Sequence, residues 1–171
     1  MNKVSFLRHI VSGVSKICPL FLMVVLGLQQ MTFAQEQQVN WLTFEQLDDS
    51  LSVAPKKVFI SFYADWCAYC KKMDRAAFKD RRVIETLSFA YYAVKMNAES
   101  LDSIAFGGKV FVNKELGKKR RPTHELALLL ASRNTEPFTL PAMILLNERF
   151  EVTQRYFSYL SPEALLEVLQ P

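Results

Sequence analysis

The sequence is poor in the residues that mark several protein classes. Its 171 residues include 5 Gly, 7 Pro and 3 Cys, and no internal repeat or low-complexity tract occurs. With 50% of the residues hydrophobic, this composition excludes collagen-like and disordered chains, which need the opposite balance. The length is typical of one globular domain with a buried core.

The sequence also lacks an apolar run of the roughly 20 residues that a membrane-spanning helix needs. Residues 17–28 come nearest, and they follow the positive charges of Lys3, Arg8 and Lys16. A charged start followed by a short apolar run is typical of a secretory signal peptide. An uncleaved leader that serves as a membrane anchor is the alternative.

Small residues at positions 32–34 predict cleavage after Ala34. Residues 1–34 would then be the signal peptide, and residues 35–171 would be one exported, periplasmic domain.

Little excess charge and little sulfur would remain after cleavage. The 21 Lys and Arg would fall to 18, against 17 Asp and Glu, so the sequence gives no reason to expect a nucleic-acid partner. Cys18 would leave with the leader, so Cys67 and Cys70 would be the remaining thiols. An exported domain with two cysteines has no wider disulfide framework.

These two cysteines lie where the apolar run 58–64 gives way to a segment with helical spacing. The first turn of a helix has unpaired N–H groups and the positive end of the helix dipole, which favour a thiolate at Cys67. Cys70 lies one turn later and can attack a mixed disulfide formed by Cys67. The pattern predicts thiol–disulfide exchange, with Cys67 as nucleophile and Cys70 as resolving thiol.

Capping residues and hydrophobic spacing predict the order of helices and strands. Strand, helix and strand from residue 58 to residue 96 imply a right-handed βαβ unit. The run 109–113 is either a short edge strand or an extended loop. The predicted helices cover residues 43–53, 67–79, 80–87, 125–132 and 161–169, and the predicted strands cover residues 58–64, 89–96, 143–146 and 150–157.

Residues 63–71 resemble the thioredoxin superfamily, given the predicted order of strands and helices around them. Their sequence is Tyr-Ala-Asp-Trp-Cys-Ala-Tyr-Cys-Lys. More closely, residues 62–72 with Phe78 and Val83 resemble the periplasmic thioredoxin-like domain of the bacterial transmembrane thiol:disulfide interchange reductases. The resemblance implies an α/β thioredoxin fold, in which helices flank a central mixed β-sheet. It also implies that residues 101–137 are an insertion before a cis-proline loop.

The resemblance assigns roles to individual residues. It implies that Cys67 attacks, that Cys70 resolves, and that Pro141 is a cis proline. Trp66, Leu140 and Pro141 would bind the substrate, with Trp66 covering the dithiol.

One residue departs from the family pattern. The family commonly has a buried acid six residues before the first cysteine, where this sequence has Ser61. Lys95 matches a family lysine near the end of the next strand and is the candidate aid to proton transfer. Glu99 or water are the candidate replacements for the acid.

The predicted function is that of a thiol:disulfide oxidoreductase, which the resemblance favours as a reductase. It would act as a monomer on client proteins that carry cysteines or disulfides, with electrons from a membrane donor. No cofactor and no metal are expected.

Two other functions use the same cysteines. A metal-binding module would hold Cu(I) between the two thiolates, whereas zinc needs four ligands and the mature chain offers only His124, expected on a helix surface. A non-catalytic interaction domain would keep the pair as a static bridge, an alternative that the missing acid at Ser61 leaves open. The basic run 118–121 is either a solvated turn or a docking patch for an acidic partner.

Overall fold

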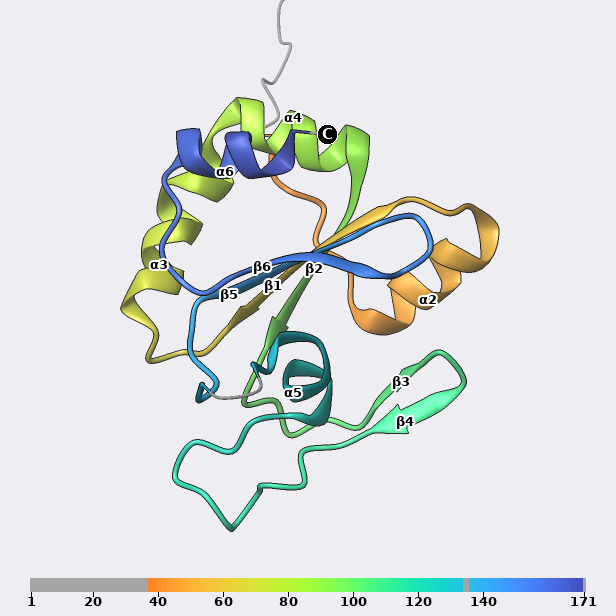
Figure 1. The fold of residues 1–171 in the computed structure, drawn as a ribbon, viewed down its shortest axis with the longest axis vertical. Helices are drawn as coiled ribbons and strands as arrows, with labels where there is room; N and C mark the ends of the chain where they lie inside the picture. Colours follow the sequence, from red (N-terminus) through yellow and green to blue (C-terminus); the bar gives the residue numbers. More distant parts are fainter. Residues whose placement is uncertain (1–36, 134–135, 171) are drawn as a thin grey trace, which may run out of the picture. The chain divides into compact units, whose positions relative to one another are not determined.

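A four-stranded mixed sheet organises residues 37–133 and 136–170, which this computed structural model describes. Its strands stand in the order β2-β1-β5-β6, with β2 parallel to β1 and with β5 and β6 antiparallel to their neighbours (Figure 1). The strands are β1 (Lys57–Tyr63), β2 (Tyr91–Asn97), β5 (Ala142–Leu146) and β6 (Val152–Tyr156).

The predicted signal peptide lies outside the described residues. Within the described part of the chain, no helix has the length and apolar character needed to cross a membrane.

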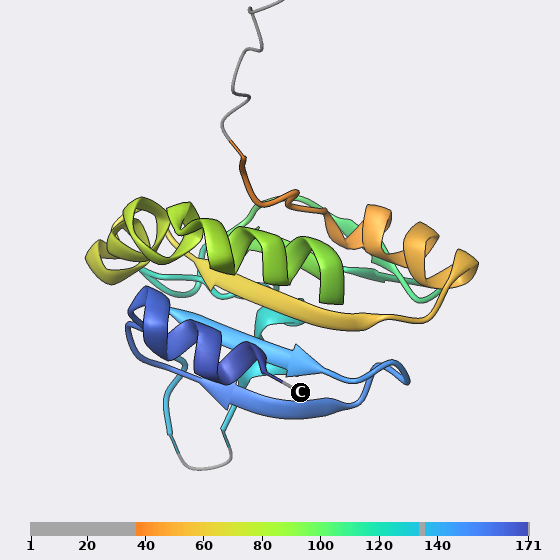
Figure 2. The same cartoon turned by 90° about the horizontal axis from the view of Figure 1, so that it is seen from above.

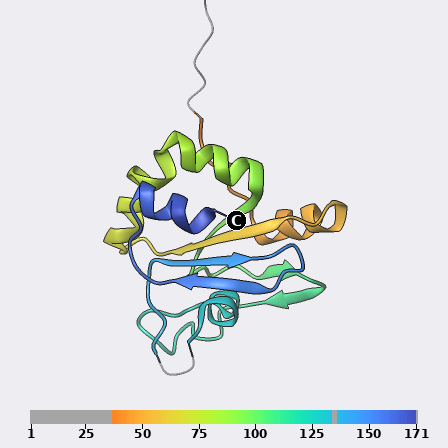
Figure 3. The same ribbon diagram turned by 45° about the horizontal axis from the view of Figure 1, so that its top comes forward.

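Helices cover both faces of the sheet. Figure 2 shows α4 and α6 side by side over one face, and Figure 3 shows α5 on the opposite side. The helices are α2 (Phe44–Val53), α3 (Ala68–Arg75), α4 (Arg81–Ala90), α5 (Glu125–Ala131) and α6 (Pro162–Leu169), with a 3₁₀ turn at Ala77–Lys79.

The alternation of side chains along β1 builds a separate core on each face. Val58, Ile60 and Phe62 pack with buried residues of α2 and α5. Phe59 packs with buried residues of α3, α4 and α6. All four side chains are fully buried, which explains why this strand is an almost continuous apolar run in the sequence.

The predicted helix caps are present. Thr43 Oγ1 accepts the N–H of Gln46 (3.2 Å) and Gln46 Oε1 accepts the N–H of Thr43 (2.9 Å), which is the predicted capping box. Ser161 Oγ accepts the N–H of Ala164 at the start of α6 (3.2 Å). Local side-chain chemistry therefore fixed where these helices begin.

Two expectations about helix ends and faces were wrong. Phe89, predicted to start a strand, lies in the last turn of α4 with 89% of its surface exposed, and β2 begins at Tyr91. Leu129, expected to pack, is 62% exposed because α5 turns Leu126 and Leu130 toward the core instead. In both cases packing against the sheet selected the buried face.

The insertion forms a hairpin of its own before it reaches α5. Strands β3 (Ile104–Phe106) and β4 (Lys109–Phe111) pair with each other as a separate two-stranded sheet. Gly107 and Gly108 form the turn between them with φ values of 57° and 70°, a backbone region that glycine adopts without a steric penalty. The run 109–113 is thus partly a strand, but not one of the main sheet.

Candidate active site

The turn after β1 carries both cysteines. Cys67 is the N-cap residue of α3, and its N–H donates to the carbonyl of Ala64 (3.0 Å). A disulfide joins Cys67 and Cys70, with Sγ atoms 2.00 Å apart and Cα atoms 5.2 Å apart. The two thiols that the sequence analysis paired are therefore bonded to each other.

The start of α3 also supplies a hydrogen-bond donor to Cys67. The N–H of Cys70 donates to Cys67 Sγ at 3.1 Å. In the reduced state this N–H and the positive end of the helix would stabilise a thiolate at Cys67. Cys67 and Cys70 are only 3% and 5% exposed, so another molecule would have to approach closely to reach either sulfur atom.

Pro141 lies beside the end of β1. Phe62 of β1 is opposite Ala142 of β5, so the residue before Ala142 lies next to the turn that leads to Cys67. The Leu140–Pro141 peptide bond is cis, as the resemblance implied. Pro141 is buried and Leu140 is half-buried, and their role toward a client remains a prediction.

Trp66 connects this site to the insertion. Its side chain is 46% exposed, and its Nε1–H donates to Glu99 Oε1 (2.9 Å). The guanidinium carbon of Arg121 lies 3.7 Å from the centre of the indole ring. Leu140 and Phe138 join these residues around a pocket of about 120 Å³. Sequence reasoning did not place Arg121 in the site, although it ends the basic run 118–121.

Lys95 is paired with a carboxylate of α3. The family pattern would instead place a buried acid on β1, at the position of Ser61. Lys95 lies opposite Ser61 in the β1–β2 register, and its Nζ lies 2.5 Å from Asp74 Oδ1. Asp74 is four residues after Cys70 on α3, and residues at this spacing share a helix face. That spacing was the signal in the sequence, and it was missed. Glu99, which was one of the two candidate replacements, accepts a hydrogen bond from Trp66.

Tyr63 lies against the same pair. Lys95 Nζ lies 5.0 Å from the centre of its ring. Burial, and then the negative charges of Asp65 and Asp74, raise the pKa of Tyr63. Its hydroxyl is therefore neutral at physiological pH.

His124 was expected on a helix surface, and this expectation was wrong, because the structure buries the residue completely. It caps α5: its Nδ1 accepts the N–H of Leu126 (3.2 Å), and its Nε2 lies 3.2 Å from the carbonyl oxygen of Asp102. The tertiary fold closes the loop before β3 over this ring. Both ring nitrogens are engaged, and among the described residues no three His, Cys, Asp or Glu side chains gather to hold a metal ion.

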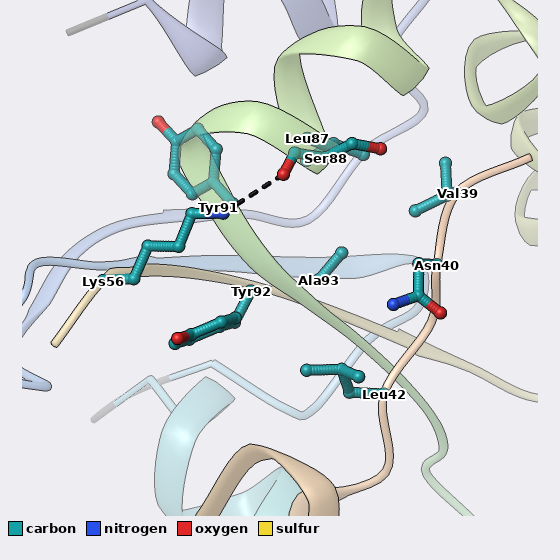
Figure 4. Close-up of a pocket in the computed structure, with 9 residues that line it drawn as sticks. All are labelled: Val39, Asn40, Leu42, Lys56, Leu87, Ser88, Tyr91, Tyr92 and Ala93. Atoms are coloured by element: carbon teal, nitrogen blue, oxygen red, sulfur yellow. Dashed lines mark hydrogen bonds between the residues drawn. The ribbon is translucent and has the colours of Figure 1, made fainter. Parts of the chain in front are cut away.

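A second pocket, of about 200 Å³, lies at the start of β2 (Figure 4). Lys56 Nζ donates to the carbonyl of Ser88 across it (3.1 Å), and burial lowers the pKa of Lys56. Tyr91, which lines this pocket, is opposite Lys57 in the parallel β1–β2 register. This is the end of β1 away from Cys67, so the pocket is separate from the disulfide.

Residues 46–171 match a family model described as a thioredoxin-like domain. The chain belongs to the thioredoxin-like family. The chain is also similar to the thiol:disulfide interchange protein DsbD of Campylobacter jejuni (strain RM1221), with 30% identity over an aligned length of 86 residues that covers 45% of this chain. The match spans only 15% of the length of that curated relative.

Solved structures show the same thioredoxin fold. A DsbH oxidoreductase superposes with a TM-score of 0.53 and 15% identity, covering 83% of this chain and 89% of that one. A thioredoxin from Thermus thermophilus superposes with a TM-score of 0.50 and 17% identity, covering 77% of this chain and 85% of that one. At these identities the likeness establishes the fold, and the predicted mixed sheet with flanking helices is confirmed.

Proposed function

We propose that this protein is an exported thiol:disulfide oxidoreductase that reduces disulfides of client proteins through Cys67 and Cys70. The observation that carries the proposal is the Cys67–Cys70 disulfide at the start of α3, with an N–H aimed at Cys67 Sγ. The relation to a thiol:disulfide interchange protein supports it. Export through residues 1–34, a periplasmic location for residues 35–171 and a monomeric state are parts of the same proposal.

The reaction has two exchange steps. The Cys67 thiolate attacks one sulfur of a client disulfide, which forms a mixed disulfide and releases the other client sulfur as a thiolate. Cys70, once deprotonated, then attacks Cys67 Sγ, which releases the second client thiolate and closes the Cys67–Cys70 bond. Two electrons pass to the client, and a membrane-bound dithiol donor would reduce the disulfide again.

The second step requires a proton acceptor for Cys70. We assign this assistance to the Asp74–Lys95 pair, because Asp74 lies one helical turn beyond Cys70 and its carboxylate is held by Lys95 Nζ. Ser61 has no carboxylate to offer. Lys95 would position Asp74 and balance its charge.

Replacing Asp74 with asparagine should slow the second step about tenfold or more at neutral pH. The rate should then rise more steeply with pH, because hydroxide replaces the missing acceptor. Stopped-flow measurement of client release between pH 6 and 9 tests this, with Asp65→Asn as the matched control. Equal slowing in both variants would show a general effect of charge and contradict the assignment.

The reductase direction is tested by the reduction potential of the wild-type protein. Equilibration with dithiothreitol buffers, followed by acid quenching and thiol alkylation, should give a reduction potential of about −270 mV, the value of thioredoxin. The protein should also accelerate insulin reduction by dithiothreitol. A potential near the about −120 mV of the oxidant DsbA would overturn the reductase assignment.

A further inference from the structure

Arg121, the last residue of the basic run 118–121, contacts Trp66 of the candidate active site. Lys119 is paired with Glu115, with Nζ 2.5 Å from Oε1, whereas the guanidinium of Arg121 lies over the Trp66 ring. The N–H groups of Arg121 form no hydrogen bond or ion pair with any described residue. The side chain is exposed, so these donors are accessible to a ligand.

The backbone that follows Arg121 is held in place. Asn113 Nδ2 donates to the carbonyl of Pro122 (3.1 Å), and Glu115 Oε2 accepts the N–H of Thr123 (3.0 Å). The N–H of His124 donates to the carbonyl of Ala98, next to Glu99 (2.8 Å). The insertion therefore presents Arg121 from a fixed loop, which lowers the entropy lost when a ligand binds.

The pocket beneath Arg121 contains one carboxylate, and that group is already bound. Glu99 Oε1 accepts the indole N–H at the edge of the Trp66 ring, whereas Arg121 covers the face of the ring. No ion pair joins Glu99 to Arg121. Glu99 keeps its negative charge at the edge of the Trp66 ring, whereas the guanidinium of Arg121 lies over the face of the ring, beside Phe138 and Leu140. The pocket therefore offers a ligand carboxylate one partner of opposite charge, and that partner is Arg121.

We infer that Arg121 is a specificity-determining residue that selects client segments with a carboxylate side chain next to the reactive cysteine. The planar guanidinium matches a carboxylate with two parallel hydrogen bonds, and stacking on Trp66 orients it beforehand. Leu140 places the pocket next to Pro141, so a chain bound there lies within reach of Cys67. The inference rests on the proposed function and adds to it the class of client.

Three synthetic peptides test the inference, with Glu, Gln or Lys on both sides of a single cysteine. Each cysteine carries thionitrobenzoate as a mixed disulfide. The Cys67 thiolate of the reduced protein attacks the peptide sulfur and expels coloured thionitrobenzoate, and Cys70 then releases the peptide thiol. The ratio of rates for two peptides within one variant does not depend on the folded fraction of that variant.

The wild-type protein should react about fivefold faster with the Glu peptide than with the Lys peptide at low salt. Arg121→Gln should bring this ratio close to one. Arg120→Gln removes one positive charge from the same basic run 118–121 and should keep most of the difference between the two peptide rates.

Equal loss of the ratio in both variants, or an unchanged ratio in Arg121→Gln, would overturn the inference. So would a preference for the Lys peptide that disappears in Glu99→Gln, because Glu99 would then be the selecting group. Equal wild-type rates with all three peptides would overturn the inference while leaving the proposed function intact. Failure to release thionitrobenzoate from any peptide would overturn both.

Discussion

Replacing Cys67 with serine is expected to reduce insulin reduction to the uncatalysed rate, a loss on the order of a thousandfold or more. The hydroxyl of serine is not ionised at neutral pH, so the variant has no nucleophile for the first exchange step. Turbidity of precipitating insulin, with dithiothreitol as electron source, measures the loss.

Serine is also a conservative choice for the structure. Cys67 is the N-cap residue of α3, and its Sγ accepts the N–H of Cys70. A serine Oγ accepts the same hydrogen bond and is among the preferred N-cap groups. The loss of activity should therefore occur without loss of α3, which circular dichroism and thermal unfolding of both proteins under reducing conditions would verify.

Full activity in Cys67→Ser would refute the exchange mechanism. A wild-type protein that does not accelerate insulin reduction, with its disulfide intact, would instead favour the static bridge of an interaction domain. The wild-type protein is active in the first case and inactive in the second. The insulin assay of both proteins therefore distinguishes an exchange that does not need Cys67 from a static bridge.

Replacing Cys70 with serine is expected to leave the first attack intact and to block the second. Cys67 would then remain joined to its client, and mixed disulfides should accumulate to a large fraction of the protein instead of being transient. Non-reducing electrophoresis of the exported protein, after acid quenching, should show adducts that disappear with dithiothreitol.

The matched control is the double variant Cys67→Ser and Cys70→Ser. It should form no adducts, because the attacking sulfur is absent. Adducts in the double variant would show that they do not pass through Cys67. Absence of adducts in Cys70→Ser under export conditions would contradict exchange with client proteins.

Local features of the sequence predicted much of the fold. The helices α2 and α6 carry their N-cap residues, Thr43 and Ser161, in the sequence, and a cap acts within its own turn. The buried strand β1 shows itself as an apolar run because both of its faces are covered. The predictions were wrong where burial depends on neighbours distant in the sequence. Phe89 is an example, because it lies in the last turn of α4 and is exposed to solvent.

The sequence by itself determined which groups are the candidates for reaction. The Cys67–Cys70 spacing, its place after an apolar strand and the start of a helix are local properties that survive in any packing of these elements. The cis proline also followed from a resemblance in sequence, and the structure confirms its isomer.

Only the tertiary structure decided what surrounds these groups. Asp74 and Lys95 are 21 positions apart and meet because α3 packs on β1 and β2. Arg121 reaches Trp66 only because the insertion folds back to the end of β1. Contacts between elements depend on how side chains pack in three dimensions, and neither hydrophobic periodicity nor a capping motif encodes that packing.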